Sequence, residues 1–127
     1  MGGRGSAGGP GGSGGSRSFS APAMSGSEKQ VSWAKDIIET PYKNLGLRAD
    51  GAAAIARRFE AGGGRADDFR AEESAYRAAQ ARYAEGMNSM AKNAPGGLKA
   101  SQVIERRGMF QQAANELAEE ELRKRRR

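Results

Sequence analysis

The densest group of side chains able to do chemistry lies at the end of the chain, where residues 115–127 read NELAEEELRKRRR. Four carboxylates are followed there by five consecutive cations, namely Arg123, Lys124, Arg125, Arg126 and Arg127. Cations at this density bind phosphate groups, and phosphate contacts dominate the affinity of proteins for nucleic acid. The segment therefore predicts a phosphate-binding tail with weak sequence preference, which Arg106 and Arg107 would extend.

Two other interpretations of the basic block stay open. Cations in the last turn of a helix interact favourably with its dipole, by about 0.3–1 kcal/mol each. The glutamates at 119–121 also precede the cations at 123–125 by four residues, a spacing that pairs opposite charges on one helix face. The block would then be a solvated helix end, although Arg126 and Arg127 lack such partners. A nuclear localisation signal is the third interpretation.

A second cluster of reactive groups consists of carboxylates, at Asp67, Asp68, Glu72 and Glu73. The chain has no histidine and no cysteine, so Ser–His and Cys–His catalysis, thiolate metal sites and disulfides are excluded. At this spacing the carboxylates are typical of a charged first helical turn, where they suit the dipole. We therefore predict no catalytic residue, no metal, no cofactor and no enzymatic activity.

The composition divides the chain into two parts. Residues 1–26 are mostly Gly, Ser, Ala and Pro, and cannot offset the roughly 1–2 kcal/mol per residue that ordering a backbone costs. They predict a disordered tail ahead of one helical domain, residues 27–127, which ends in the basic tail 123–127. No apolar run is long enough to span a membrane, so we expect a soluble cytoplasmic protein with no membrane partner.

Helical periodicity and breaking residues predict a small all-α bundle of about four helices. Ser27 and Gln30 have the spacing of a capping box at the start of the first helix. Pro41 should kink that helix or end it nearby, because proline lacks a backbone donor. Gly108 leaves open whether the last helix is single or divided into 99–107 and 109–125. The predicted helices are 27–45, 51–61, 66–92 and 99–125.

Two apolar patterns predict how these helices pack. In the first helix, one face is formed by Val31, Ala34, Ile38, Tyr42 and Leu45. Trp33 and Ile37 widen this face, and Trp33 is expected to supply the largest apolar burial. In the third helix, a stripe with seven-residue spacing consists of Phe69, Tyr76, Tyr83 and Met90. Such a stripe is typical either of a core face or of a seam between two copies of the chain.

Two short segments resemble parts of known proteins. Residues 27–37, SEKQVSWAKDI, are similar to the opening helix of a group of small proteins from bacteria, phages and other mobile elements. Residues 99–107, KASQVIERR, are similar to a second helix of that group. The resemblance implies a mobile-element setting and transfers no site residue, because the group has no defined catalytic residues. If the two segments pair, Val103 and Ile104 should lie near Trp33.

Three hypotheses for function follow. The first is a non-enzymatic accessory protein that binds nucleic acid or a nucleoprotein complex, in the cytoplasm of a bacterial or phage-infected cell. The second is an inhibitor or modulator of a host nuclease or defence complex. The third is a phage structural or assembly protein that self-associates, as a homodimer or larger assembly, through Phe69, Tyr76, Tyr83 and Met90.

Overall fold

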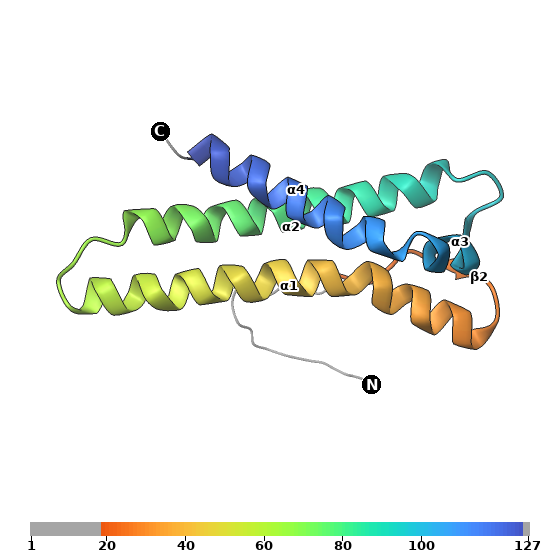
Figure 1. Ribbon diagram of the computed structural model, residues 1–127, viewed down its shortest axis with the longest axis horizontal. Coiled ribbons are helices and arrows are strands. Elements are labelled where there is room, and N and C mark those ends of the chain that lie inside the picture. The colour runs from red at the N-terminus through yellow and green to blue at the C-terminus, as the bar shows by residue number, and fades with distance from the viewer. Residues whose placement is uncertain (1–18, 126–127) are drawn as a thin grey trace.

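A computed structural model describes residues 19–125, which form a bundle of helices with one short pair of strands (Figure 1). In chain order the elements are β2 (Met24–Ser25), α1 (Glu28–Ala61), α2 (Asp67–Asn93), β3 (Leu98–Lys99), α3 (Ala100–Glu105) and α4 (Arg107–Arg125). The all-α class and the number of helices, four in the described residues, are confirmed. The predicted disorder of residues 1–18 lies outside the described residues.

The first two predicted helices, 27–45 and 51–61, are wrong as separate elements, because α1 is a single helix. It begins where the sequence indicates. The Ser27 hydroxyl accepts from the backbone of Gln30 at 3.2 Å, and the Gln30 side chain accepts from the backbone of Ser27 at 3.3 Å. This capping box is confirmed, and the helix then continues for 34 residues.

Helix α1 continues through Pro41, and α2 bonds to its carbonyl groups on both sides of the proline. The Tyr83 hydroxyl donates to the carbonyl of Ile38 at 2.6 Å. The Gln80 amide donates to the carbonyl of Tyr42 at 3.0 Å. Pro41 itself is buried against the neighbouring helices, so tertiary packing outweighs the lost backbone hydrogen bond.

The three long helices enclose a core of aromatic and aliphatic side chains. Its largest fully buried members are Ile38, Leu45, Tyr83 and Phe110. Helix α4 ends beside Ser74, and α1 and α2 continue past it as a two-helix extension (Figure 1). We call this extension, residues 50–73, the distal arm. Its buried apolar residues are all alanines, namely Ala52, Ala53, Ala56 and Ala66.

The predicted last helix, 99–125, is two helices, and the break is at Arg106 rather than at Gly108. Arg106 leaves the helical region, with φ −108° and ψ 27°. The carbonyl of Ile104 at this break accepts a hydrogen bond from the Arg107 side chain at 2.9 Å. A side-chain donor thus satisfies a carbonyl at the end of α3, which allows α4 to start in a new direction.

The prediction that residues 1–26 are disordered is wrong for residues 19–26. The ring of Phe19 lies 4.9 Å from that of Tyr42, between centroids, and the backbone of Ala21 donates to the Glu39 carboxylate at 2.9 Å. Strand β2 then pairs in parallel with β3. Phe19 is the only aromatic residue in the predicted tail, and its contact with the core stabilises the ordered segment.

Candidate nucleic-acid interface

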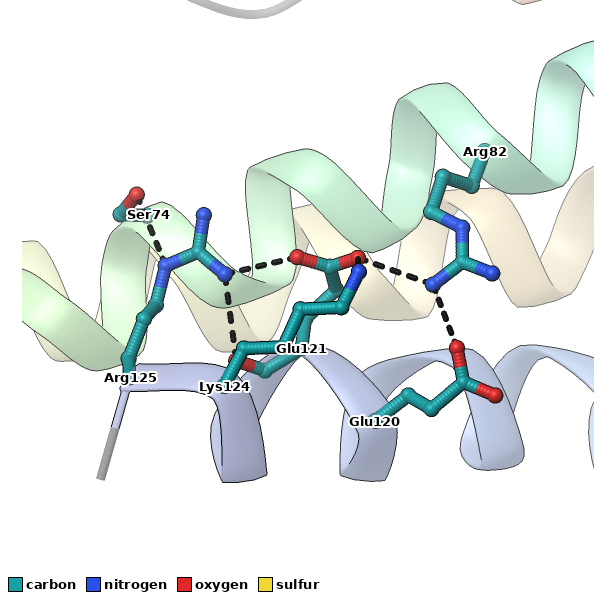
Figure 2. Close-up of polar contacts among 6 residues, drawn as sticks. All are labelled: Ser74, Arg82, Glu120, Glu121, Lys124 and Arg125. Carbon is teal, nitrogen blue, oxygen red and sulfur yellow. Dashed lines mark hydrogen bonds and ion pairs between the residues drawn. The ribbon is translucent and has the colours of Figure 1, made fainter. Parts of the chain in front are cut away.

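The C-terminal half of α4 carries a buried carboxylate, Glu121, which is only 4% exposed (Figure 2). Its oxygens accept from Arg125 at 2.6 Å, from Lys124 at 3.0 Å and from Arg82 of α2 at 2.8 Å. These hydrogen bonds, led by those from Arg125 and Lys124, lower the pKa of Glu121 to about 2. A buried carboxylate is tolerated only with such partners, so the cluster is a structural ion-pair site.

This geometry changes the interpretation of the predicted phosphate-binding tail. Lys124 and Arg125 are already bound to Glu121, and Arg125 also donates to Ser74 of α2 at 3.2 Å. Arg123 is exposed and forms no ion pair with any of residues 19–125. Arg126 and Arg127 lie outside the described residues. Two cations of the block are therefore occupied by Glu121 within α4, and one of them, Arg125, also reaches α2. Phosphate binding by the block stays a prediction.

Arg106 and Arg107 lie at the opposite end of α4 in a different environment. Both are exposed, and neither forms an ion pair within the described part of the chain. The guanidinium carbon of Arg107 is 5.8 Å from the ring centroid of Trp33 in α1, which is within the range of a cation–π contact. Arg107 is held there by its hydrogen bond to the carbonyl of Ile104. Its charge is therefore positioned but not neutralised.

The prediction that Trp33 supplies the largest apolar burial is wrong, because its exposed fraction is 51%. Ala34 and Ile38 point into the core, whereas Trp33 lies on the flank of α1. The sequence contains a signal for this placement. Thr40 and Asn44, seven and eleven residues after Trp33, fall on the same face by the 3.6-residue period and are polar. They indicate that this face meets solvent.

The segments 27–37 and 99–107 do pair, since the start of α1 packs against α3. Val103 is buried in the core, and Ile104 packs against it. The pairing brings the α3–α4 junction next to Trp33, with Arg107 over the indole ring. The sequence predicts this contact between the segments but not that their aromatic residue faces outward.

A shallow groove of about 500 Å³ lies between α1 and the start of α4. Its lining residues are Trp33, Asp36, Ile37, Thr40, Pro41, Arg107, Gly108 and Gln111. Lys29 is exposed one helical turn before Trp33, without an ion pair among residues 19–125. We call Lys29, Trp33, Arg106 and Arg107 the Trp33 surface. It combines a half-exposed indole, one face of which lies under the Arg107 guanidinium, with cations that form no ion pair in the described residues. An exposed aromatic ring beside such cations suits a planar ring attached to phosphate.

A larger groove, of about 640 Å³, lies between α2 and α4 but is unsuited to a polyanion. Three carboxylates line it, those of Glu85, Glu116 and Glu120. The one cation in its lining, Arg82, is bound to Glu120 at 2.7 Å as well as to Glu121. Like charge would repel phosphate from this groove.

The stripe predicted for self-association packs within its own chain. Tyr83 is 1% exposed, and Tyr76 and Met90 pack partly buried against the core. Phe69 stacks on Phe59 of the distal arm, with ring centroids 5.3 Å apart. The stripe thus forms the inner face of α2. Self-association through it stays a prediction, and would require these side chains to leave their present contacts.

The acidic cluster forms the first turns of α2, as the sequence predicts. Asp67 pairs with Arg65 at 2.9 Å, and Glu73 pairs with Arg70 at 3.0 Å and with Arg77 at 3.6 Å. Within residues 19–125, no group of three or more acidic side chains is arranged to hold a metal ion. In the same residues, no helix has the length and apolar character needed to cross a bilayer.

The chain matches no protein-family model, and no curated protein or solved structure is detectably similar to it. The resemblance of residues 27–37 and 99–107 to mobile-element proteins is therefore neither supported nor contradicted. The function proposed below therefore rests on the geometry of the Trp33 surface.

Proposed function

We propose that this protein is a non-enzymatic nucleic-acid-binding protein, and that the Trp33 surface binds a single strand. The observation that carries the proposal is a half-exposed tryptophan whose ring lies beside the unpaired guanidinium of Arg107. Stacking of one base on an aromatic side chain contributes about 1–3 kcal/mol to binding. The cations of the surface supply the phosphate contacts that such binding needs.

A single strand fits this surface better than a duplex. The faces of unpaired bases are accessible, whereas those in a duplex are covered by their neighbours. Trp33 projects from the flank of α1 beside a shallow groove, so it can receive a base that has left its stack. The nucleic acid could also belong to a nucleoprotein complex, since the binding chemistry is the same.

The biological setting is part of the same proposal. Its support is the resemblance of residues 27–37 and 99–107 to proteins of phages and mobile elements. In that setting the protein is an accessory factor in the cytoplasm of a bacterial or phage-infected cell. Arg123, Arg126 and Arg127 would add further phosphate contacts from the C-terminal block.

The test is binding of a labelled 12-nucleotide single strand of mixed sequence, measured by fluorescence anisotropy across a salt series. Trp33→Ala should weaken binding about 5- to 100-fold, as expected for the loss of one stacked base. The matched control is Phe59→Ala, because Phe59 is an aromatic residue of similar exposure, 47%, on the distal arm. It should bind like the wild type.

A second measurement uses the fact that Trp33 is the only tryptophan in the chain. A base stacked on the indole should quench its fluorescence in step with the anisotropy change. The same sequence as a duplex should bind more weakly and quench less. Binding that persists at full strength in Trp33→Ala would contradict the proposal, as would equal losses in the two alanine variants.

A protein partner is the second candidate, and the observation that favours it is a set of exposed apolar side chains along α1. Leu47, Ile55 and Phe59 are 67%, 40% and 47% exposed there. A nuclease or defence complex, or a second copy of the chain, would bury these side chains. Ile55→Lys should then abolish the interaction while Trp33→Ala preserves it. For a second copy, sedimentation velocity would show a dimer that Ile55→Lys dissociates.

A further inference from the structure

We infer that the groove beside Trp33 selects an unpaired guanine, whose base-pairing edge is recognised by the carboxylate of Asp36. This inference rests on the proposed function and adds a base preference to it. The starting observation is a single carboxylate in the lining of a groove that is otherwise apolar, neutral or cationic.

Asp36 is placed to contact a ring stacked on Trp33. It follows Trp33 by three residues, which puts the two side chains next to each other on one face of α1. Both line the same groove, together with Thr40. Asp36 is exposed, and it forms no ion pair or side-chain hydrogen bond with any of residues 19–125, even though Arg107 lines the same groove. Its two oxygens are therefore available acceptors.

The chemistry of a carboxylate distinguishes guanine from the other bases. A carboxylate can accept two parallel hydrogen bonds, in the manner of its pairing with arginine. Guanine presents two neighbouring donors on one edge, the ring N1–H and the exocyclic N2–H. Adenine and cytosine each present one amino donor beside a ring acceptor. Uracil and thymine present one N–H between two carbonyl oxygens, which the carboxylate would repel.

The rest of the groove agrees with a purine nucleotide. Ile37 and Pro41 give the groove an apolar floor beside the indole. The Arg107 guanidinium, at 5.8 Å from the indole centroid, lies near the outer limit of about 6 Å for a cation–π contact. The guanidinium would leave that contact when a ring stacks on this face of the indole. With Lys29 it would then face the phosphates on either side of the stacked nucleotide.

The experiment compares nine-nucleotide single strands that differ only at their central base, four thymidines on each side of guanine, adenine, cytosine or thymine. Binding is followed by anisotropy and by Trp33 fluorescence, and repeated with the uridine-based RNA series. Wild-type protein should prefer the guanine strand at least about tenfold, the discrimination that a bidentate base contact provides. Asp36→Asn should reduce this preference to less than about threefold.

The control is Glu28→Gln, which removes one negative charge from the same end of α1 without altering the groove lining. It should keep the full preference for guanine. Equal affinity of the wild type for all four strands would overturn the inference and leave the proposed function standing. A guanine preference that survives in Asp36→Asn would overturn the role of Asp36. If no strand binds, the proposed function fails along with the inference.

Discussion

The two basic clusters of this protein lie at opposite ends of α4, about 28 Å apart by the rise of a helix, and they differ in what their charges face. Lys124 and Arg125 surround the buried carboxylate of Glu121. Arg106 and Arg107 form no ion pair in the described residues, and Arg107 lies over the half-exposed indole of Trp33. Lys124 and Arg125 are therefore less available to a ligand than Arg106 and Arg107. A buried acid, rather than the local density of cations, determines which arginines remain free for a ligand.

The largest effect should come from reversing the charge at the centre of the first cluster. Glu121→Lys would place a fourth cation among Arg82, Lys124 and Arg125, with no anion left between them. Breaking a buried ion pair in this way typically costs about 3–5 kcal/mol. We expect a loss of that size in the free energy of unfolding, measured by urea denaturation followed by circular dichroism.

The control for this variant is Glu119→Lys, an exposed position two residues earlier on the same helix. It should change the unfolding free energy by less than about 0.5 kcal/mol. If both variants lose the same small amount, Glu121 is not the charge that fixes α4 against α2.

Neutralising each pair of cations separately should affect different properties. The pair at 124 and 125 should mainly affect the free energy of unfolding, and the pair at 106 and 107 should mainly affect binding of a single strand. Lys124→Gln with Arg125→Gln should lower the unfolding free energy by about 1–2 kcal/mol, because Arg82 remains as the one charged partner of Glu121. Arg106→Gln with Arg107→Gln should lower the unfolding free energy by less than about 1 kcal/mol, because the exposed hydrogen bond of Arg107 to the Ile104 carbonyl and its cation–π contact are lost. It should weaken single-strand binding and reduce the salt dependence by about 1.4 in slope, at about 0.7 per phosphate contact.

The proposed difference between the two clusters is contradicted if their effects on stability and on binding are exchanged. A double variant at 124 and 125 that keeps its stability but loses most of its salt dependence would show that the C-terminal block is the main phosphate site. The same experiment includes Arg123→Gln, which tests the one cation of the block that is described and unpaired. Arg123→Gln should reduce the slope of log affinity against log salt concentration by less than the double variant at 106 and 107 does.

The sequence predicts the helical class and the start of α1 well, because the capping box and the apolar period are local signals. It does not predict that α1 continues past Pro41. That continuity depends on the packing of this part of α1 against α2, where Gln80 and Tyr83 donate to carbonyls 38 and 45 residues away in the sequence. The break at Arg106 likewise depends on how α3 and α4 pack, and the sequence indicates Gly108 instead.

The candidate site is predictable in part. The pair Arg106–Arg107 stands out as a charge pattern, and its contact with the start of α1 follows from pairing of the two segments. The exposure of Trp33 contradicts the usual expectation for the largest apolar side chain, and only the polar residues Thr40 and Asn44, two and three helical turns further along α1, indicate it. The burial of Glu121 has no local signal, because Glu119 and Glu120 beside it are the same residue type and are exposed.

The smallest effect, and the most specific to Glu121, is on the pH dependence of stability. Its pKa is about 2 in the folded protein against an ordinary value of 4.5. The ionised form is therefore favoured by folding, and its contribution is complete above pH 4.5 and is lost as the pH falls towards 2. Glu121→Gln lacks this contribution at every pH. The wild type should thus be more stable than Glu121→Gln at pH 6, and the difference should shrink by about 1–2 kcal/mol as the pH falls from 6 through 4 to 3.

Other carboxylates do not produce this narrowing difference. Hydrogen bonding to Arg70 lowers the pKa of Glu60 and hydrogen bonding to Arg82 lowers that of Glu120, but both glutamates are present in wild type and variant and largely cancel in the difference. For Glu119→Gln, measured alongside by thermal denaturation, the stability difference from wild type should not change as the pH falls from 6 to 3. If the stability difference between wild type and Glu121→Gln stays constant from pH 6 to pH 3, the Glu121 carboxylate is not held by its three cations. The C-terminal block would then be as available to phosphate as the pair at 106 and 107.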